Sequence, residues 1–293
     1  MGKSEDQTGE IADWLTDRAL RTLIGAAMLM PHERRVPFMG GLVRRLGRRV
    51  GYETRIFDNL NRIWPGLPAS RKQEIAYGVL DNFGRTLIEN YSYNSFGQWL
   101  VDTPIAGEGL AAVEEARAAG RPVLFVTGHF GNHEVPRQVL SARGYQIGGL
   151  YRPMANRFFN DHYAKTMTEL SGPVFAQGKS GTMGFARHLK QGGMGTLLFD
   201  VDVHGGMVID FLGHPARTAA SAADLALRLN ALVVPYFGIR QPDGLSFEAA
   251  IEAPIPHSDP RGMMIEMTKR LEARIEAHPE QWFWVHRRWK AKV

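Results

Sequence analysis

Cysteine is absent from the 293 residues of the sequence. This absence excludes disulfide bonds, a catalytic thiolate, and any zinc or iron–sulfur site that depends on cysteine ligands. It is compatible with a reducing compartment, in which disulfides are rare.

Long hydrophobic runs are also missing. A membrane-spanning helix needs about 20 consecutive apolar residues, and the best candidate, Ala19–Met30, is shorter and contains Arg21. Asp13 and Asp17 precede this segment, which does not suit a signal peptide. We therefore expect neither a spanning helix nor a cleaved leader, and a cytoplasmic protein that is soluble or lies on the membrane.

The composition is that of a folded protein. Hydrophobic residues make up 44% and charged residues 22% of the sequence, which argues against disorder. A chain of this length can form one large α/β domain, or a core domain with a helical extension.

Positive charge is in excess, with a formal net charge of +5. Such a balance suits an anionic partner: nucleic acid, an anionic membrane, or an acidic substrate or carrier. The basic residues gather in two clusters: Arg34, Arg35, Arg44, Arg45, Arg48, Arg49 and Arg55, and then His286, Arg287, Arg288, Lys290 and Lys292. A solvated surface explains any single arginine, but two clusters beside apolar segments favour a membrane surface.

The first third of the chain has helical periodicity. Apolar residues recur at helical spacing in four segments: residues 11–30, 35–50, 54–63 and 70–91. The second segment has Phe38, Leu42 and Leu46 on one face and arginines around the other. This pattern is typical of a helix lying in a membrane interface, and it equally fits a surface helix packed on the core. We expect residues 1–103 to form a helical, membrane-associating region.

Strands and helices alternate in the rest of the chain. Short apolar runs predict strands at residues 123–127, 145–151, 174–175, 195–199, 207–211, 232–237 and 245–250. Helical patterns between them predict helices at residues 108–119, 132–143, 157–170, 182–190, 220–229 and 260–277. The alternation predicts an α/β core over residues 104–293, with a central, mostly parallel sheet flanked by helices.

A histidine beside a glycine follows the first predicted strand, in the block Gly128-His-Phe-Gly-Asn-His-Glu134. Catalytic groups of open α/β sheets gather at the carboxyl ends of strands. A neutral imidazole can take a proton from a hydroxyl, and a carboxylate can orient the ring and compensate its charge. His129 is the candidate base and Glu134 its candidate partner. Residues five apart lie ~140° apart on a helix, so this pairing requires His129 in the turn before the helix.

Other interpretations of this block stay open. Glu134 could be a charge at a helix start and His129 a plain turn residue. His133 could be the functional imidazole, a zinc ligand together with His129, or a surface residue. The H-E-x-x-H zinc pattern is absent, so we expect no metal at this position.

Gly128–Glu134 closely resembles the Gly-His-Phe-Gly-Asn-Trp-Glu block of the bacterial lipid A biosynthesis (late) acyltransferase family, within the wider His-x4-Asp/Glu glycerolipid acyltransferases. Three further blocks resemble the family in the same order. The first is Tyr151-Arg-Pro-Met-Ala-Asn156, and the last is His278–Lys290. The middle block runs from Asp200 to Asp210-Phe-Leu-Gly213-His-Pro-Ala216, with Thr218 just after it. The resemblance covers roughly residues 11–293. Four ordered blocks are specific together in a way that none is alone.

The resemblance implies an enzyme that moves a fatty acyl group from a thioester to a lipid hydroxyl. The donor would be acyl carrier protein or acyl-CoA, the acceptor a lipid A precursor, and no cofactor would be needed. A variant with the same chemistry would use a lysophospholipid or an aminolipid as acceptor. The resemblance also implies His129 as the base and Glu134 as its partner.

Substrate binding is expected from Arg152, Asn156 and Asp200. The resemblance implies that Arg152 binds an acidic group or stabilises the developing oxyanion; the alternative is an ion pair with Asp161 or Asp200. Asn156 could instead cap the next helix. Asp200 sits at a strand end, where it could belong to the site or anchor Arg152.

The sequence departs from the family pattern in two places. His133 replaces the usual tryptophan, so the pocket wall beside the base would be more polar. The family's spanning helix is missing or reduced to Ala19–Met30, so we expect peripheral attachment to the cytoplasmic face of the bacterial inner membrane.

Trp282, Trp284 and Trp289 lie beside basic residues, which suits a membrane interface; core packing is the alternative.

Two other classes of function fit the sequence less well. A serine esterase or thioesterase of the α/β-hydrolase kind would need a G-x-S-x-G elbow, which the sequence lacks. A non-enzymatic basic binding module would explain the charge but not the four ordered blocks. Nucleic-acid-binding motifs are absent, so nucleic acid is not an expected partner.

Overall fold

The computed structural model describes residues 2–154 and 156–290. Ala155 of the second block and Lys292 of the second basic cluster lie outside the described residues. In the described part, helices come first: α1 (Gly2–Met28), α2 (His32–Arg49), α3 (Tyr52–Ile63), α4 (Ala69–Tyr91) and α5 (Tyr93–Trp99). The first four correspond to predicted helices. The short α5 follows α4 after one residue and carries no separate signal in the sequence.

A seven-stranded sheet forms the centre of the described chain, in the order β1-β9-β8-β2-β5-β3-β4. Its strands are β1 (Ile105–Ala106), β2 (Val123–Thr127), β3 (Ile147–Tyr151), β4 (Val174–Ala176), β5 (Met194–Leu198), β8 (Leu232–Arg240) and β9 (Phe247–Ile251). The strands from β8 to β4 run parallel to one another, whereas β9 is antiparallel to β8. The prediction of a mostly parallel sheet flanked by helices is confirmed.

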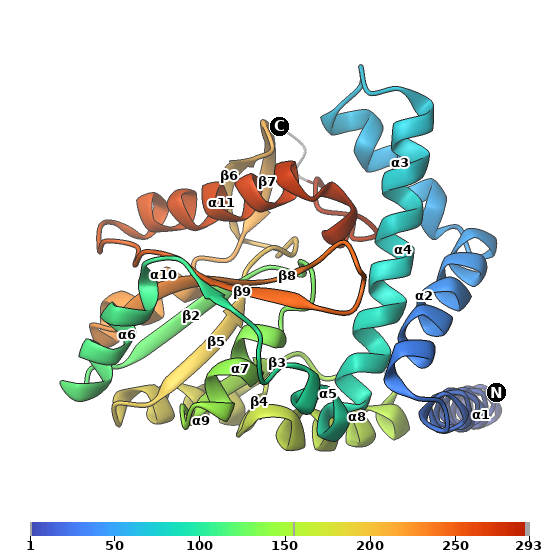
Figure 1. Cartoon of the computed structure of the whole chain (residues 1–293), viewed down its shortest axis with the longest axis horizontal. Helices are drawn as coiled ribbons and strands as arrows, with labels where there is room; N and C mark the ends of the chain where they lie inside the picture. The colour runs from blue at the N-terminus through green and yellow to red at the C-terminus, as the bar shows by residue number, and fades with distance from the viewer. Residues whose placement is uncertain (1, 155, 291–293) are drawn as a thin grey trace.

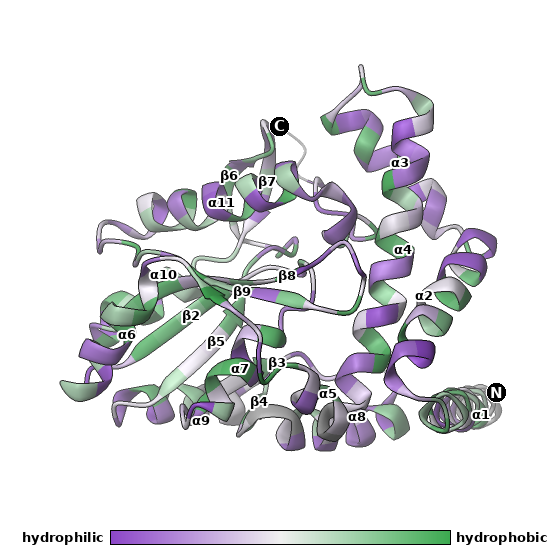
Figure 2. Cartoon of the chain, viewed as in Figure 1, coloured by the Kyte–Doolittle hydropathy of each residue, from purple (hydrophilic) through white to green (hydrophobic). Residues whose placement is uncertain are grey.

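Helices cover both faces of this sheet. They are α6 (Gly109–Ala118), α7 (Val135–Ala142), α8 (Arg157–Ser171), α9 (Lys179–Lys190), α10 (Ser221–Leu229) and α11 (Pro260–Ala277). Figure 1 shows α11 on one side of the sheet and α6 and α7 on the other. Leu124 and Val126 of β2 pack with α9, α10 and α11, whereas Val123 and Phe125 pack with α6 and α7. β2 is therefore buried throughout and hydrophobic along its length (Figure 2), as a parallel strand covered on both faces must be.

The strand predicted at residues 207–211 forms outside the central sheet. β6 (Met207–Phe211) pairs antiparallel with β7 (His214–Thr218), and the two make a separate hairpin. Leu212 and Gly213 turn the chain with φ angles of 51° and 75°, a conformation that glycine adopts easily and leucine rarely. The sequence did not predict β7, because Pro215 weakens its strand pattern.

The C-terminal segment packs back onto the core, and its tryptophans are part of that core. Trp282, Trp284 and Trp289 are 1%, 0% and 7% exposed. Their rings contact one another, with centroids 4.8, 6.0 and 6.2 Å apart. The membrane-interface prediction for these three residues is therefore wrong, and the alternative of core packing is correct.

Helix α4 crosses the carboxyl-terminal edge of the sheet, beside α2 (Figure 1). Asn82 and Thr86 of α4 donate hydrogen bonds to the carbonyl of Gly131, shortly after β2 ends. Glu89 of α4 binds Arg240, the last residue of β8. Helix α4 thus contacts the carboxyl ends of β2 and β8, the edge of the sheet at which the sequence predicts the catalytic residues. Within the described residues, no helix combines the length and the apolarity needed to cross a membrane.

Candidate active site

The turn after β2 brings the predicted base to the surface of a cleft. Gly131 has a φ of +55°, and a Cβ atom added to it would lie 1.9 Å from the carbonyl oxygen of Gly238. An added Cβ at Gly128 would lie 2.7 Å from Leu271 and 3.0 Å from the carboxylate of Asp200. Only glycine satisfies both positions, because the backbone passes so close to its neighbours.

His129 is bound to Asp200, which lies just beyond β5. One carboxylate oxygen of Asp200 is 2.8 Å from Nδ1 of His129. The other accepts hydrogen bonds from the His129 backbone N–H at 2.7 Å and from the indole N–H of Trp282 at 2.9 Å. β2 and β5 are neighbours in the sheet, so their carboxyl ends bring together residues 71 positions apart.

The environment sets the charges of this pair. Burial raises the pKa of Asp200, but the charge and hydrogen bonds of His129 and the bond from Trp282 outweigh it and hold that pKa well below its usual range. Desolvation lowers the pKa of His129, but the charge and the hydrogen bond of Asp200 raise it above its usual value overall. When Nδ1–H donates to Asp200, the lone pair of the neutral ring is on Nε2.

Glu134 does not hold the ring of His129. Its carboxylate lies 3.3 Å from Arg137 and 3.7 Å from Nε2 of His133. Arg137 is 1% exposed and donates to the carbonyl of Ile147 at 2.9 Å, so the Glu134–Arg137 pair ties α7 to β3. The predicted pairing is corrected here: Asp200 reaches Nδ1 from the adjacent parallel strand, whereas Glu134 stands before α7 and faces its arginine.

His133 stands beside the base, with its ring centroid 5.7 Å from that of His129. Desolvation lowers the pKa of His133, which keeps it neutral near pH 7. Asp200 binds Nδ1 of His129, so a zinc ion shared by these two histidines would have to bind Nε2 of His129. In residues 2–154 and 156–290, no three His, Asp or Glu side chains lie close enough to hold a metal ion.

A cleft of about 150 Å³ opens next to the two histidines. Its walls come from α4 and from the C-terminal segment. The lining residues are Val79, Asn82, Phe83, Thr86, His129, Gly131, His133, Gln281, Trp282 and Phe283. The rings of Phe83 and Phe283 lie 5.3 Å apart and make this wall mainly apolar. The His129 side chain is 37% exposed, so it is accessible from this side.

The remaining predicted binding residues lie apart from this pair. Arg152 is exposed at the end of β3, and in the described part of the chain it forms no ion pair with Asp161 or Asp200. Asn156 caps α8: its side-chain oxygen accepts from the N–H of Phe159 at 3.1 Å, and its amide nitrogen donates to the carbonyl of Asp13 at 2.8 Å. The capping interpretation of Asn156 is therefore confirmed.

The sequence does not predict the contacts of three residues in the site region. Trp282, which the sequence places either at a membrane interface or in the core, binds Asp200. Asp202 forms a two-bond ion pair with Arg217, at 2.9 and 2.7 Å, and its N–H donates to Nε2 of His286 at 2.8 Å. Burial lowers the pKa of His286, so it is a neutral acceptor rather than part of a cationic cluster. The position of these residues within the matching blocks was the only sequence signal for them.

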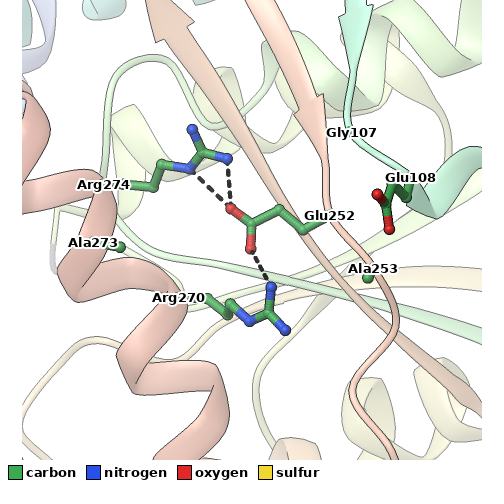
Figure 3. A pocket seen from close by; sticks show the side chains of 7 residues that line it. All are labelled: Gly107, Glu108, Glu252, Ala253, Arg270, Ala273 and Arg274. Carbon is green, nitrogen blue, oxygen red and sulfur yellow. Dashed lines mark hydrogen bonds and ion pairs between the residues drawn. The ribbon is translucent and has the colours of Figure 1, made fainter.

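A wider hollow of about 440 Å³ lies elsewhere, between β9 and α11, and Figure 3 shows it closely. Arg274 binds one carboxylate oxygen of Glu252 at 2.6 and 2.8 Å, and Arg270 lies 3.6 Å from the other. Glu108 lies on the far side of this hollow. Both of its arginines bind Glu252 and no imidazole lines it, so size does not make it the better reaction site.

The cleft at His129 combines three chemical capacities. Nε2 can take a proton, Asp200 can stabilise the imidazolium that results, and the apolar wall can accept a hydrocarbon chain.

Comparisons with known proteins agree with this chemistry. A family model described as "Bacterial lipid A biosynthesis acyltransferase" matches residues 4–291.

Curated relatives carry related names. The chain is 23% identical over 284 residues to Lipid A biosynthesis acyltransferase 2 of Shigella flexneri, covering 93% of this chain and 88% of the relative. It is 22% identical over 261 residues to Lipid A biosynthesis myristoyltransferase of Escherichia coli (85% and 80% covered). The identity to Lipid A biosynthesis lauroyltransferase of the same organism is 26% over 248 residues (81% and 78%). Because the family model matches residues 4–291, the chain belongs to the bacterial lipid A biosynthesis acyltransferases and is an acyltransferase.

Proposed function

We propose that this enzyme transfers a fatty acyl group from an acyl thioester to a hydroxyl of a lipid A precursor, with His129 as the general base and Asp200 as its partner. The observation that carries the proposal is the pair itself. A buried carboxylate 2.8 Å from Nδ1 leaves Nε2 as the basic atom, beside an apolar cleft.

The proposed reaction uses this pair in two steps. Nε2 of His129 takes the proton of the acceptor hydroxyl while the hydroxyl oxygen attacks the thioester carbonyl carbon. The charge of Asp200 stabilises the imidazolium and its hydrogen bond holds the ring in place. When the carbon–sulfur bond breaks, the imidazolium returns the proton to the departing thiolate.

The acyl chain would enter the cleft along the wall that the contacting rings of Phe83 and Phe283 form. At about 150 Å³, the cleft is smaller than the roughly 300–1,000 Å³ of pockets that enclose a drug-sized ligand. It would therefore hold the part of the chain next to the reacting carbonyl, and the rest would extend toward its open side. Acyl carrier protein is the proposed donor, with acyl-CoA as the alternative.

The acceptor is proposed from the relatives, whose names refer to lipid A biosynthesis. A lysophospholipid or an aminolipid is the second candidate, because it would present a hydroxyl to the same base. Arg152, exposed at the end of β3, is the proposed contact for an acidic group of the substrate. For Asn156 we propose a role in holding α8 against α1, since both ends of its amide are engaged there.

A membrane surface is the proposed setting, at the cytoplasmic face of the inner membrane, with residues 1–103 as the attached region. Large apolar side chains are exposed on α1 and α2 and between or just after them: Ile11, Trp14, Leu15, Met28, Leu29, Phe38, Leu46 and Val50. Exposed arginines accompany them: Arg34, Arg44, Arg45, Arg48 and Arg49. Apolar rings and cations together suit an anionic lipid surface.

The test is acyl transfer by the purified protein from an acyl carrier protein thioester, with candidate acceptor lipids supplied one at a time. Lipid mass spectrometry of a strain that lacks the protein identifies the physiological acceptor as the lipid that loses one acyl chain. Release of free fatty acid at the same rate with and without acceptor would identify a thioesterase and overturn the proposal.

A further inference from the structure

A buried network of hydrogen bonds lies directly behind the His129 turn, between α4 and the end of β8. Its centre is the ion pair of Glu89 and Arg240, which are joined by two bonds of 2.5 and 2.8 Å. Their side chains are 0% and 6% exposed. A buried ion pair often contributes no more stability than apolar side chains of the same size, so its presence suggests a role in holding one particular geometry.

The network reaches the turn at two consecutive residues. Asn132 is fully buried; its amide donates to Glu89 at 3.0 Å, and its side-chain oxygen accepts from a backbone N–H two residues later at 3.1 Å. The carbonyl of Gly131 accepts from Asn82 at 3.0 Å and from Thr86 at 3.1 Å. Three side chains of α4 therefore bind the two residues that lie two and three positions after His129.

Arg240 ties the same groups to the sheet and to the wall of the cleft. Its guanidinium donates to Asn82 at 2.8 Å and to Thr86 at 3.2 Å. Its backbone exchanges two hydrogen bonds with the side chain of Gln281, at 2.9 and 2.8 Å. The carbonyl of Gln281 accepts from the N–H of Gly131 at 2.9 Å. The turn is thus fixed from α4, from β8 and from the C-terminal segment.

We infer that Glu89 and Asn132 are positioning residues that hold His129 in register with Asp200. The inference rests on the proposed role of His129 as base. The His129 ring is fixed by Asp200, and the His129 carbonyl accepts from the N–H of Phe283 at 3.0 Å. A shift of the residues just after it would move Nδ1 away from Asp200 and Nε2 away from the substrate. A misplacement of about 1 Å can cost roughly 10²-fold in rate.

The test compares Asn132→Ala and Glu89→Gln with the control Glu252→Gln. The control removes the charge of another mostly buried carboxylate bound by arginine, but in the wider hollow away from the cleft. Asn132→Ala removes the link between Glu89 and the turn and leaves the Glu89–Arg240 pair intact. It therefore keeps the inference testable if Glu89→Gln, which strands a buried arginine, fails to fold.

For Asn132→Ala we expect kcat to fall by about 10–100-fold with KM nearly unchanged. The pKa of His129, followed by NMR of its imidazole, falls because the ring loses part of its interaction with Asp200. Glu252→Gln keeps the wild-type kcat and the wild-type pKa of His129.

Two failures can be told apart. If Asn132→Ala keeps the wild-type kcat and the wild-type pKa of His129 while His129→Ala is inactive, the network only stabilises the fold and the inference is wrong. If His129→Ala itself transfers acyl groups at the wild-type rate, the proposed function of His129 fails. The NMR titration of His129 in Asn132→Ala then still decides whether the network positions the ring.

Discussion

Asp200 and Glu252 are both largely shielded from water and bound by nitrogen-bearing side chains, but they have different roles. Asp200 is 2% exposed and its partner is an imidazole beside an apolar cleft. Glu252 is 9% exposed, and its partners are Arg270 and Arg274 on α11, as Figure 3 shows. Each carboxylate is bound by a partner that reaches it from another element.

The difference lies in what the partner can do. A guanidinium stays protonated throughout the ordinary pH range, so the Glu252 cluster can only hold α11 against the sheet. An imidazole gains and loses its proton near pH 7, so the Asp200 pair can take part in proton transfer. Whether a buried carboxylate can take part in proton transfer therefore depends on the chemistry of its partner, not on its burial or on the size of the adjacent hollow.

His129→Ala is expected to have the largest effect, because it removes the titrating partner and leaves Asp200 bound only to backbone and indole N–H groups. Loss of a general base costs on the order of 10²–10⁴-fold in rate. We expect acyl transfer to fall by at least that much while the circular dichroism spectrum stays that of the wild type. A folded variant with wild-type transfer would remove His129 from the mechanism.

Asp200→Asn is expected to have the next largest effect, because it keeps the shape of the partner and removes its charge. A roughly 10²–10⁴-fold loss in kcat/KM is expected, since the imidazolium is no longer stabilised and the tautomer is no longer fixed. The base acts only when neutral, so kcat/KM falls as the pH drops through the pKa of His129. Asp200 raises that pKa; in the variant the acid limb therefore moves to lower pH.

Steady-state rates across the pH range measure this shift, and Asp202→Asn is the matched control. Asp202 lies two residues along the same segment but pairs with Arg217 rather than with the base. We expect its acid limb to coincide with that of the wild type. An acid limb that stays in place in Asp200→Asn would mean that His129 is not the group whose titration limits the rate.

The fold could be predicted from the sequence because its signals are local. The run at residues 123–127 is β2 as predicted, and the helical period of residues 70–91 gave α4 to within one residue. Local signals could not give the partner of β6, since a hairpin with Pro215 in its second strand lacks a strand pattern. Nor could they show that Trp282 is buried, because burial depends on which segment packs above it.

The site was half predictable for the same reason. The position of His129 directly after a strand predicts a base, but spacing along the chain predicts Glu134, the nearest carboxylate, as its partner. The true contact depends on β2 and β5 being neighbours, which follows from strand order and not from spacing. The sequence alone identifies Asp200 only as a strand-end carboxylate and a candidate binding residue.

Glu134→Gln tests a third carboxylate, which lies near His133 but is bound to an arginine. Arg137 is 1% exposed, so removing the charge of its partner costs about 3 kcal/mol or more of stability. We expect a lower midpoint of thermal unfolding, and a kcat within about tenfold of the wild type for the protein that remains folded. A loss of activity as large as that of Asp200→Asn, at unchanged stability, would restore Glu134 to the catalytic pair.

Glu252→Gln should have the smallest effect, because it changes the carboxylate that is bound by arginines rather than by the base. Its arginines are 35% and 28% exposed, so water solvates them when the carboxylate charge is removed. We expect a loss of about 1–2 kcal/mol in the free energy of unfolding, measured by urea titration, with kcat, KM and the acid limb all unchanged. A carboxylate whose partners cannot titrate contributes to the rate only through folding. A lower kcat in folded Glu252→Gln would therefore mean that the wider hollow takes part in the reaction.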